Sequence, residues 1–104
     1  MFPLLVLHLI GREPTYGNRL IDSIEQITQG TISVNPNTMY PLLRALEQEG
    51  LVAAAWEHPE RRSRRFYTLT GAGEAERARL ASEAAPRLDA VAAALAALRA
   101  ELGL

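Results

Sequence analysis

The chain has 104 residues, 48% of them hydrophobic, which is enough for one small globular domain with a modest core. Its 11 basic residues and 12 acidic residues give a net charge of −1, so nucleic-acid binding would depend on local clusters of arginine rather than on bulk charge. No cysteine is present, which excludes disulfides, thiolate metal sites and a cysteine nucleophile and favours a cytoplasmic location.

The first segment, residues 2–10, is apolar apart from His8. It is too short to cross a bilayer and lacks the basic leader of a signal peptide, so we expect a buried helix over about residues 3–11. Pro3 is tolerated in the first turn of such a helix. We expect His8 to be a core or interface residue rather than a ligand, because His58 lies far away in the sequence.

A second helix is predicted over residues 15–29. The residues 11–14 break the chain before it, and Gly30 ends it. Its apolar residues recur at helical spacing and should form one buried face: Leu20, Ile21, Ile24 and Ile27.

Residues 35–52 carry the clearest helix signals. Asn35 can cap the helix with its side chain, Pro36 suits the first helical position, and Gly50 suits the position after the last turn. At about 100° per residue, one stripe of this helix is apolar and holds Met39, Leu42, Leu43 and Leu46. The opposite stripe holds Asn37, Tyr40, Pro41, Arg44 and Gln48.

This polar stripe differs from an ordinary solvated helix face, which mixes glutamate and lysine. Asparagine, glutamine and arginine can form paired hydrogen bonds with base edges in the DNA major groove. Tyrosine and threonine hydroxyls commonly contact phosphates. On this segment alone, an ordinary amphipathic surface helix explains the pattern equally well.

A β-hairpin is predicted next, from strand-like segments 51–57 and 64–70. Its tip holds four arginines within five residues: Arg61, Arg62, Arg64 and Arg65. Guanidinium groups on a protruding tip suit contacts with DNA phosphates, because neutralised phosphates release counterions. Glu57 and Glu60 would weaken the local field, and chance clustering on a solvated loop is the alternative. Trp56 is expected to pack on the first strand rather than to stack on a ligand.

The last segment predicts a long alanine-rich helix, capped by Thr70 and kinked or broken at Pro86. Its larger apolar residues follow a 3-4-3-4 spacing that is typical of a seam between paired helices: Leu88, Val91, Leu95, Leu98 and Leu102. We expect the same helix of a second copy as the partner, in a two-fold dimer. The alternative is a helix that folds back on its own domain.

Motifs for catalysis are missing from the sequence. No histidine and carboxylate residues stand at metal-ligand spacing, no glycine-rich phosphate motif occurs, and no serine stands in a nucleophile elbow. We therefore expect neither an enzyme nor a bound metal or cofactor.

The order of elements is that of a mainly α fold with a small β-hairpin, namely a winged helix-turn-helix with an added C-terminal helix. We expect residues 1–72 to form the DNA-binding domain and residues 73–104 to form the dimerisation helix, in one compact unit. The helix that ends at Gly50 would lie in the major groove of double-stranded DNA, and the hairpin would reach the flanking backbone or minor groove.

Residues 14–17, 36–52 and 64–70, together with Gly73, resemble the PadR family of bacterial transcriptional regulators. The resemblance covers about residues 4–80, and the single helix after the hairpin is similar to the short-chain subfamily. It implies a homodimeric DNA-binding repressor of detoxification, efflux or stress genes, often released by a small aromatic or drug-like ligand. Some drug-binding members have an aromatic residue on the C-terminal helix, whereas residues 88–104 have none.

The resemblance also implies roles for particular residues. Tyr16 and Gly17 match the positions that open the family's second helix, Thr38 and Tyr40 match its DNA-backbone contacts, and Arg64 with Arg65 matches the basic end of its wing. The complete set of expected DNA contacts is Tyr16, Asn37, Thr38, Tyr40, Arg44, Arg61, Arg62, Arg64 and Arg65.

Together these patterns predict a transcriptional regulator, a repressor by resemblance, that binds a pseudo-palindromic operator as a homodimer. The competing interpretation is a winged-helix adaptor that binds another protein through the same surface without reading DNA.

Overall fold

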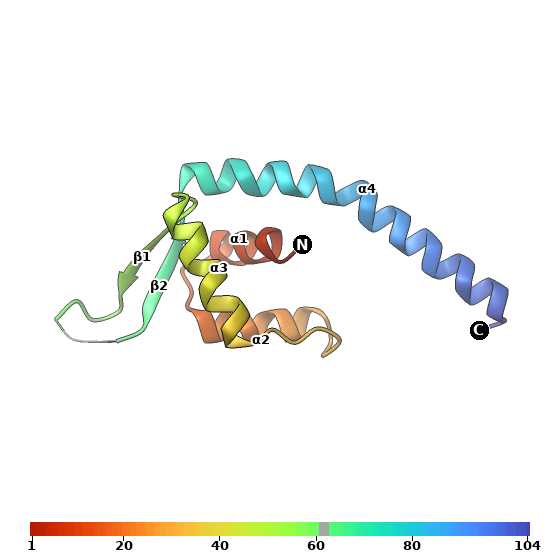
Figure 1. Cartoon of the computed structure of the whole chain (residues 1–104), viewed down its shortest axis with the longest axis horizontal. Coiled ribbons are helices and arrows are strands. Elements are labelled where there is room, and N and C mark those ends of the chain that lie inside the picture. Colours follow the sequence, from red (N-terminus) through yellow and green to blue (C-terminus); the bar gives the residue numbers. More distant parts are fainter. Residues whose placement is uncertain (61–62) are drawn as a thin grey trace.

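The computed structural model describes residues 1–60 and 63–104 (Figure 1). The elements are α1 (Phe2–Arg12), α2 (Gly17–Ile27), α3 (Pro36–Gln48), β1 (Val52–Trp56), β2 (Arg65–Leu69) and α4 (Gly71–Leu102). Their order confirms the predicted fold class, which is mainly helical with one antiparallel hairpin and a long C-terminal helix. The molecule extends over 60 × 27 × 20 Å, because α4 projects well beyond the other elements (Figure 1).

The core lies between α1, α2, α3 and the hairpin. Its fully buried side chains are Val6, Leu7, Ile10, Leu20, Ile24, Met39 and Leu43. Each such side chain contributes about 1.5–3 kcal/mol by leaving water. The predicted buried face of α2 is correct for Leu20 and Ile24, but Ile27 is 50% exposed. Ile27 is the last residue of α2, where the helix has already passed the core.

α3 forms as its sequence predicts. The Oδ1 atom of Asn35 accepts a hydrogen bond from the backbone N–H of Asn37 at 2.7 Å, and Pro36 is the first helical residue. Gly50 has a φ of +75°, which allows the N–H of Leu51 to donate to the carbonyl of Leu46 at 3.0 Å. A side chain at Gly50 would be strained in this left-handed conformation, so glycine ends the helix here.

Periodicity places the start of α2 near Thr15, which is slightly too early, whereas the resemblance, which places the opening of this helix at Tyr16 and Gly17, agrees with the structure. Thr15 is extended and pairs with β2: its N–H donates to the carbonyl of Tyr67 at 3.2 Å, and its carbonyl accepts from the N–H of Tyr67 at 2.8 Å. Thr15 is 5% exposed, and the helix begins two residues later at Gly17. Helical periodicity cannot reveal this start, because the pairing partner lies about fifty residues away in the sequence.

β1 and β2 pair from Val52↔Leu69 to Trp56↔Arg65, so both strands are slightly shorter than expected. The hairpin is closed beyond the strands by the hydroxyl of Ser63, which accepts from the N–H of His58 at 2.9 Å. Trp56 is 44% exposed on the outer part of β1. The first strand therefore carries a partly covered ring rather than a core residue.

α4 begins as predicted and then divides into two parts. The hydroxyl of Thr70 accepts from the N–H of Gly73 at 3.0 Å, and Leu80 and Ala84 pack near α1. The helix continues through Pro86, so of the two expectations, a kink or a break, the break does not occur; Figure 1 shows a bend along the helix. His8 is exposed on α1, so it is not a core residue, and its place in an interface stays a prediction.

Candidate nucleic-acid interface

The polar stripe of α3 is exposed. Its residues Asn37, Tyr40, Pro41, Arg44 and Gln48 are all exposed, and so is the neighbouring Thr38, whereas Met39, Leu43 and Leu46 on the other side of the helix are buried. The side of α3 that helical periodicity predicts to be apolar is therefore the side that the structure buries against the core. The exposed face of α3 therefore carries amide, hydroxyl, phenol and guanidinium groups, and the buried side chains of the same helix hold it against the core.

Tyr40 is held in place by the start of α2. Its hydroxyl donates to Oδ1 of Asn18 at 3.3 Å. A Cβ atom at Gly17 would lie 2.6–2.7 Å from atoms of the Tyr40 ring, so only glycine allows the ring to lie there. The sequence alone gave no physical reason for a glycine at position 17, and it did not indicate Asn18 as a residue of the site. Only the fold shows that α2 and α3 meet at these residues.

Arg64 lies in the loop at the end of the wing, directly before β2, and its side chain turns back toward the domain. Its Nε and Nη2 atoms donate to the Glu57 carboxylate at 3.0 and 3.1 Å, and its guanidinium carbon lies 4.2 Å from the centre of the Tyr16 ring. Tyr16 packs edge-on against Phe66, with 5.4 Å between ring centres. The bond to Glu57 raises the pKa of Arg64 above its usual value, so the guanidinium stays charged at any physiological pH.

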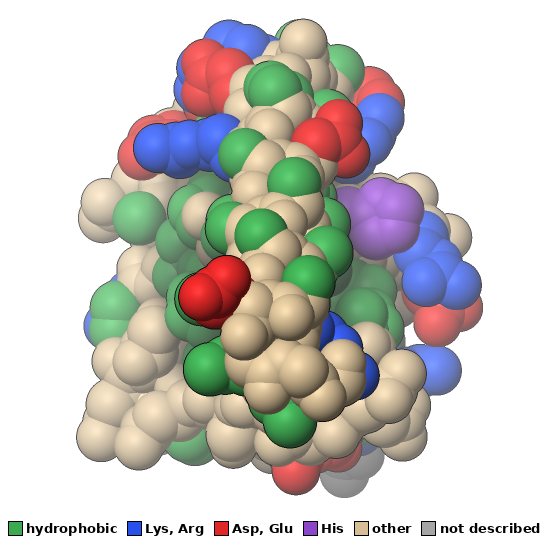
Figure 2. All heavy atoms as spheres, turned by 90° about the vertical axis from the view of Figure 1, so that its right-hand side faces the viewer, with side chains coloured by type: hydrophobic (Ala, Val, Ile, Leu, Met, Phe, Trp, Pro, Cys, Tyr) green, Lys and Arg blue, Asp and Glu red, His purple; other side chains and the backbone are tan. Residues whose placement is uncertain are grey.

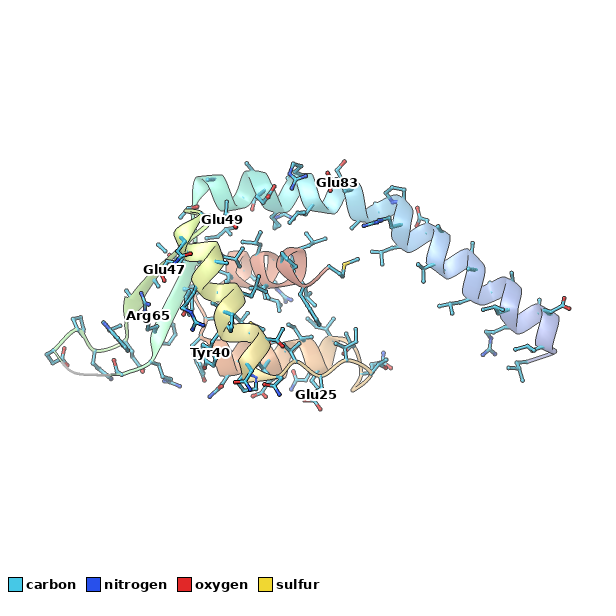
Figure 3. All side chains as sticks on the ribbon, viewed as in Figure 1. Glu25, Tyr40, Glu47, Glu49, Arg65 and Glu83 are labelled. Atoms are coloured by element: carbon cyan, nitrogen blue, oxygen red, sulfur yellow. The ribbon has the colours of Figure 1, made fainter. Side chains whose placement is uncertain are left out.

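Arg65 also folds back onto the domain. Its Nη2 atom donates to Oε2 of Glu47 at 3.0 Å, and its guanidinium lies 5.7 Å from the Trp56 ring centre. Glu47 belongs to α3 and Arg65 opens β2, so this pair joins the helix to the wing (Figure 3). Arg64 is exposed in the loop, as the predicted tip requires, whereas Arg65 is only partly exposed and opens β2. The prediction that four arginines share one exposed tip is therefore wrong for Arg65. Arg61 and Arg62 lie outside the described residues.

These side chains border one groove of about 320 Å³. It lies between the start of α2, α3 and the wing, and its lining is Tyr16, Gly17, Asn18, Tyr40, Arg44, Ser63, Arg64, Arg65 and Tyr67. Five of the nine predicted contact residues thus come together here, namely Tyr16, Tyr40, Arg44, Arg64 and Arg65. Asn37 and Thr38 are exposed at the first turn of α3, outside the lining.

The floor of the groove contains a buried phenol. Tyr67 is 4% exposed, and burial raises its pKa above the ordinary value of tyrosine, while the charge of Arg65 opposes this shift. The Nε atom of Arg65 is also buried, and it has no hydrogen-bond partner among the described residues. Arginine donors and hydroxyl groups at one groove can bind an anionic oxygen, so the arrangement suits a phosphate.

A second exposed surface lies on α4. The predicted seam residues are all more than half exposed: Leu88 53%, Val91 56%, Leu95 56%, Leu98 57% and Leu102 67%. Seen from the side on which α4 projects, hydrophobic side chains lie uncovered along its C-terminal half (Figure 2). Of the two expectations for this helix, folding back describes only its first part, up to Ala84.

Other kinds of site find no support among residues 1–60 and 63–104. No group of three or more histidine or carboxylate side chains there could hold a metal ion. None of the helices in this part of the chain has the length and apolar character required to cross a membrane.

The sequence model of the PadR-like family of transcriptional regulators matches residues 6–79. The chain belongs to this family. A PadR family transcriptional regulator from Eggerthella lenta is 32% identical, with a TM-score of 0.74 over 90% of this chain and 80% of that one. A PadR-like transcription factor from Bacteroides fragilis is 27% identical, with a TM-score of 0.71 over 88% and 86% of the two chains.

Among curated proteins, the transcriptional regulator YqjI of Escherichia coli is 35% identical over 49 residues, which are 47% of this chain. The chain spans about a quarter of the length of the curated relatives it matches. The PadR-like match ends at residue 79 and therefore includes α3, the wing and the groove between them. The exposed seam of α4 lies beyond it.

Proposed function

We propose that this PadR-like protein is a sequence-reading DNA-binding transcriptional regulator that acts as a homodimer. One observation carries the proposal: α3 presents an exposed face of Asn37, Tyr40 and Arg44 beside a groove that is lined by Arg64 and Arg65 of the wing. A helix with such a face suits the major groove of double-stranded DNA, and a groove with cationic walls suits the phosphate backbone next to it.

Within this arrangement the contact residues have different tasks. Arg44 and Asn37 contact base edges, and Arg44 is the residue we assign to a two-point contact with guanine. Thr38 and Tyr40 contact phosphates, and Tyr16 lies where the backbone passes the start of α2. Arg61, Arg62, Arg64 and Arg65 supply the wing's salt-dependent attraction.

We assign residues 1–72 to DNA binding and residues 73–104 to dimerisation. In the dimer, Leu88, Val91, Leu95, Leu98 and Leu102 pack against the same residues of a second copy. Without a partner, these five large apolar side chains are exposed to water along one helix face, which is unfavourable in free energy. Pairing with a second helix buries them. A two-fold dimer places its two α3 helices about one DNA turn apart, which predicts a pseudo-palindromic operator.

Repression and release by a ligand rest on the resemblance to PadR proteins. We propose a repressor that acts by occupying its operator in the cytoplasm. A small aromatic or drug-like effector is proposed from this resemblance alone, because the groove of about 680 Å³ between α1 and α2 is lined mainly by polar and charged residues. This lining includes Arg12, Glu13, Arg19 and Asp22.

One observation favours the second candidate, a winged-helix adaptor for another protein. Arg64 and Arg65 are paired with Glu57 and Glu47, which lowers the positive field that DNA would meet at the wing. An adaptor would keep its partner at moderate salt and would show no retention on DNA.

Salt-dependent retention on immobilised duplex DNA separates the two functions. We expect the protein to bind at low salt and to elute as salt rises, with a slope that reflects several phosphate contacts. Replacing Arg61, Arg62 and Arg64 together by glutamine should flatten this slope. The matched control replaces Arg79, Arg87 and Arg99 of α4 by glutamine and should leave the slope nearly unchanged. A wing variant that behaves like this control would remove the wing from the interface.

A further inference from the structure

Glu57 and Arg64 face each other across the end of the wing. The carboxylate of Glu57 accepts from both Nε and Nη2 of Arg64, at 3.0 and 3.1 Å, which is a two-point contact. Phosphate binds arginine through the same pair of donors. Arg64 lines the groove that also contains Tyr40 and Arg44, so its guanidinium lies where we place the DNA backbone.

The hairpin does not depend on this pair for closure. The backbone N–H of Glu57 already donates to the carbonyl of Arg64 at 2.7 Å, and the Ser63 hydroxyl closes the loop at His58. The side chains of Arg64 and Glu57 are 52% and 30% exposed. Ion pairs this open to water contribute little to folding stability, because solvent screens them. The pair therefore has a small structural role and a large effect on the charge of the groove.

We propose that Glu57 is a built-in competitor of the DNA phosphates for Arg64. This inference rests on the proposed function. When the protein binds DNA, a phosphate oxygen replaces the Glu57 carboxylate at Nε and Nη2 of Arg64, and the carboxylate moves away from this guanidinium. The exchange sets a lower affinity for DNA of any sequence, and it leaves sequence preference to α3.

The contact between Arg64 and Tyr16 would allow Arg64 to exchange the carboxylate for a phosphate without moving its guanidinium. The guanidinium lies 4.2 Å from the centre of the Tyr16 ring, and Phe66 packs against that ring. An aromatic face attracts a guanidinium whether or not a carboxylate is bound to it. Arg64 can therefore keep its position while its anionic partner changes.

Replacing Glu57 by glutamine tests the inference, because the amide keeps the shape of the side chain and removes its charge. Binding of a fluorescent mixed-sequence duplex is measured by anisotropy at several salt concentrations. We expect E57Q to bind roughly two- to fivefold more tightly than the natural protein, by the ordinary strength of an exposed ion pair. The slope of log affinity against log salt should steepen by up to about 0.9 per wing.

Two further variants test whether the gain in affinity depends on the pair of Glu57 and Arg64. E60Q removes a charge from the same wing, but Glu60 interacts only weakly with His58, at 3.8 Å, so we expect a smaller gain and less change in slope. In an R64Q background, the substitution E57Q should change affinity no more than E60Q does. Thermal melts of all variants show that each is folded.

The possible outcomes are distinct. A gain for E57Q that exceeds the gain for E60Q and disappears with R64Q supports the exchange. Equal effects of E57Q and E60Q, or weaker binding by E57Q, overturn it while DNA binding by the natural protein stands. If the natural protein and all variants fail to bind the duplex at low salt, the proposed function fails, and the inference fails with it.

Discussion

The three arginines that line the groove differ in whether a carboxylate of the same chain pairs with them. Arg64 and Arg65 make ion pairs with Glu57 and Glu47, whereas Arg44 makes no ion pair within residues 1–60 and 63–104. Sequence reasoning could select all three, because each lies in an informative pattern. It could not tell them apart, because the pairing of Arg65 with α3 depends on how helix and wing pack in the folded chain.

Arg44 is therefore the residue with the sharpest expected effect on sequence reading. We expect Arg44→Ala to lose about 1–3 kcal/mol of discrimination at one base position of each half-site. Gln48→Ala, one turn further along the same face, is the control and should change preference less. Selection of bound sequences from random duplexes measures both. An unchanged preference in the Arg44 variant would remove this residue from base reading.

Tyr67 predicts a dependence of stability on alkaline pH. Burial raises the pKa of Tyr67 in the folded chain, so the folded state favours the neutral phenol. Its contribution to stability is full below the pKa of the unfolded chain, near 10, and is lost as pH rises through the folded pKa. Chemical denaturation between pH 8 and about 11 should show a smaller alkaline loss for Tyr67→Phe. Equal losses would mean that the phenol is not desolvated.

At the scale of elements, the end of α3 and the start of α4 form one joint. The hydroxyl of Thr70 donates to the carbonyl of Gly50 at 2.6 Å and accepts from the N–H of Gly73 at 3.0 Å. The cap was predictable from sequence, since threonine before a helix is a common pattern. The link to Gly50 was not, because it joins residues that only the folded hairpin brings together.

Two glycines at this joint should respond oppositely to the same change. A Cβ atom at Gly73 would overlap the carbonyl oxygen of Leu51, whereas one at Gly71 meets nothing within 4 Å. We expect Gly73→Ala to lower the free energy of unfolding by about 1–3 kcal/mol. Gly71→Ala should be neutral or slightly stabilising, by up to about 1 kcal/mol. Urea denaturation compares them, and equal stabilities would contradict the close packing at Gly73.

Most element positions followed from caps and periodicity, and the start of α2 shows where these signals fail. Asn35, Gly50 and Thr70 mark ends that the structure confirms. Thr15 was placed in a helix, although it pairs with Tyr67 in β2. Local sequence describes local hydrogen bonds well, and it fails where a residue's partner lies far along the chain.

At the scale of the whole molecule, α4 has two environments. Its first part packs on α1 through Leu80 and Ala84, and its second part, from Leu88 onward, is exposed. Helix periodicity predicted the apolar seam, but it could not show where the domain's own core stops covering the helix. We propose that the exposed part of α4, from Leu88 onward, is the surface that contacts a second copy of the chain.

Breaking the seam should separate the copies. We expect Leu95→Asp to give monomers by light scattering, because an unpaired carboxylate would be buried in the interface. Ala93→Asp places the same charge about 160° away around the helix and should leave the dimer intact. A dimer that survives the Leu95 change would place the interface elsewhere. Monomers from both changes would indicate a general effect on helix stability.

The most direct test of the account is selection of bound sequences from random duplex DNA with the purified protein at two salt concentrations. We predict an enriched inverted repeat, with half-sites about one helical turn apart, that persists at the higher salt. This result would establish a dimeric regulator in which α3 reads DNA. Weak binding without enrichment, lost at the higher salt, would contradict sequence reading by α3 and favour the adaptor.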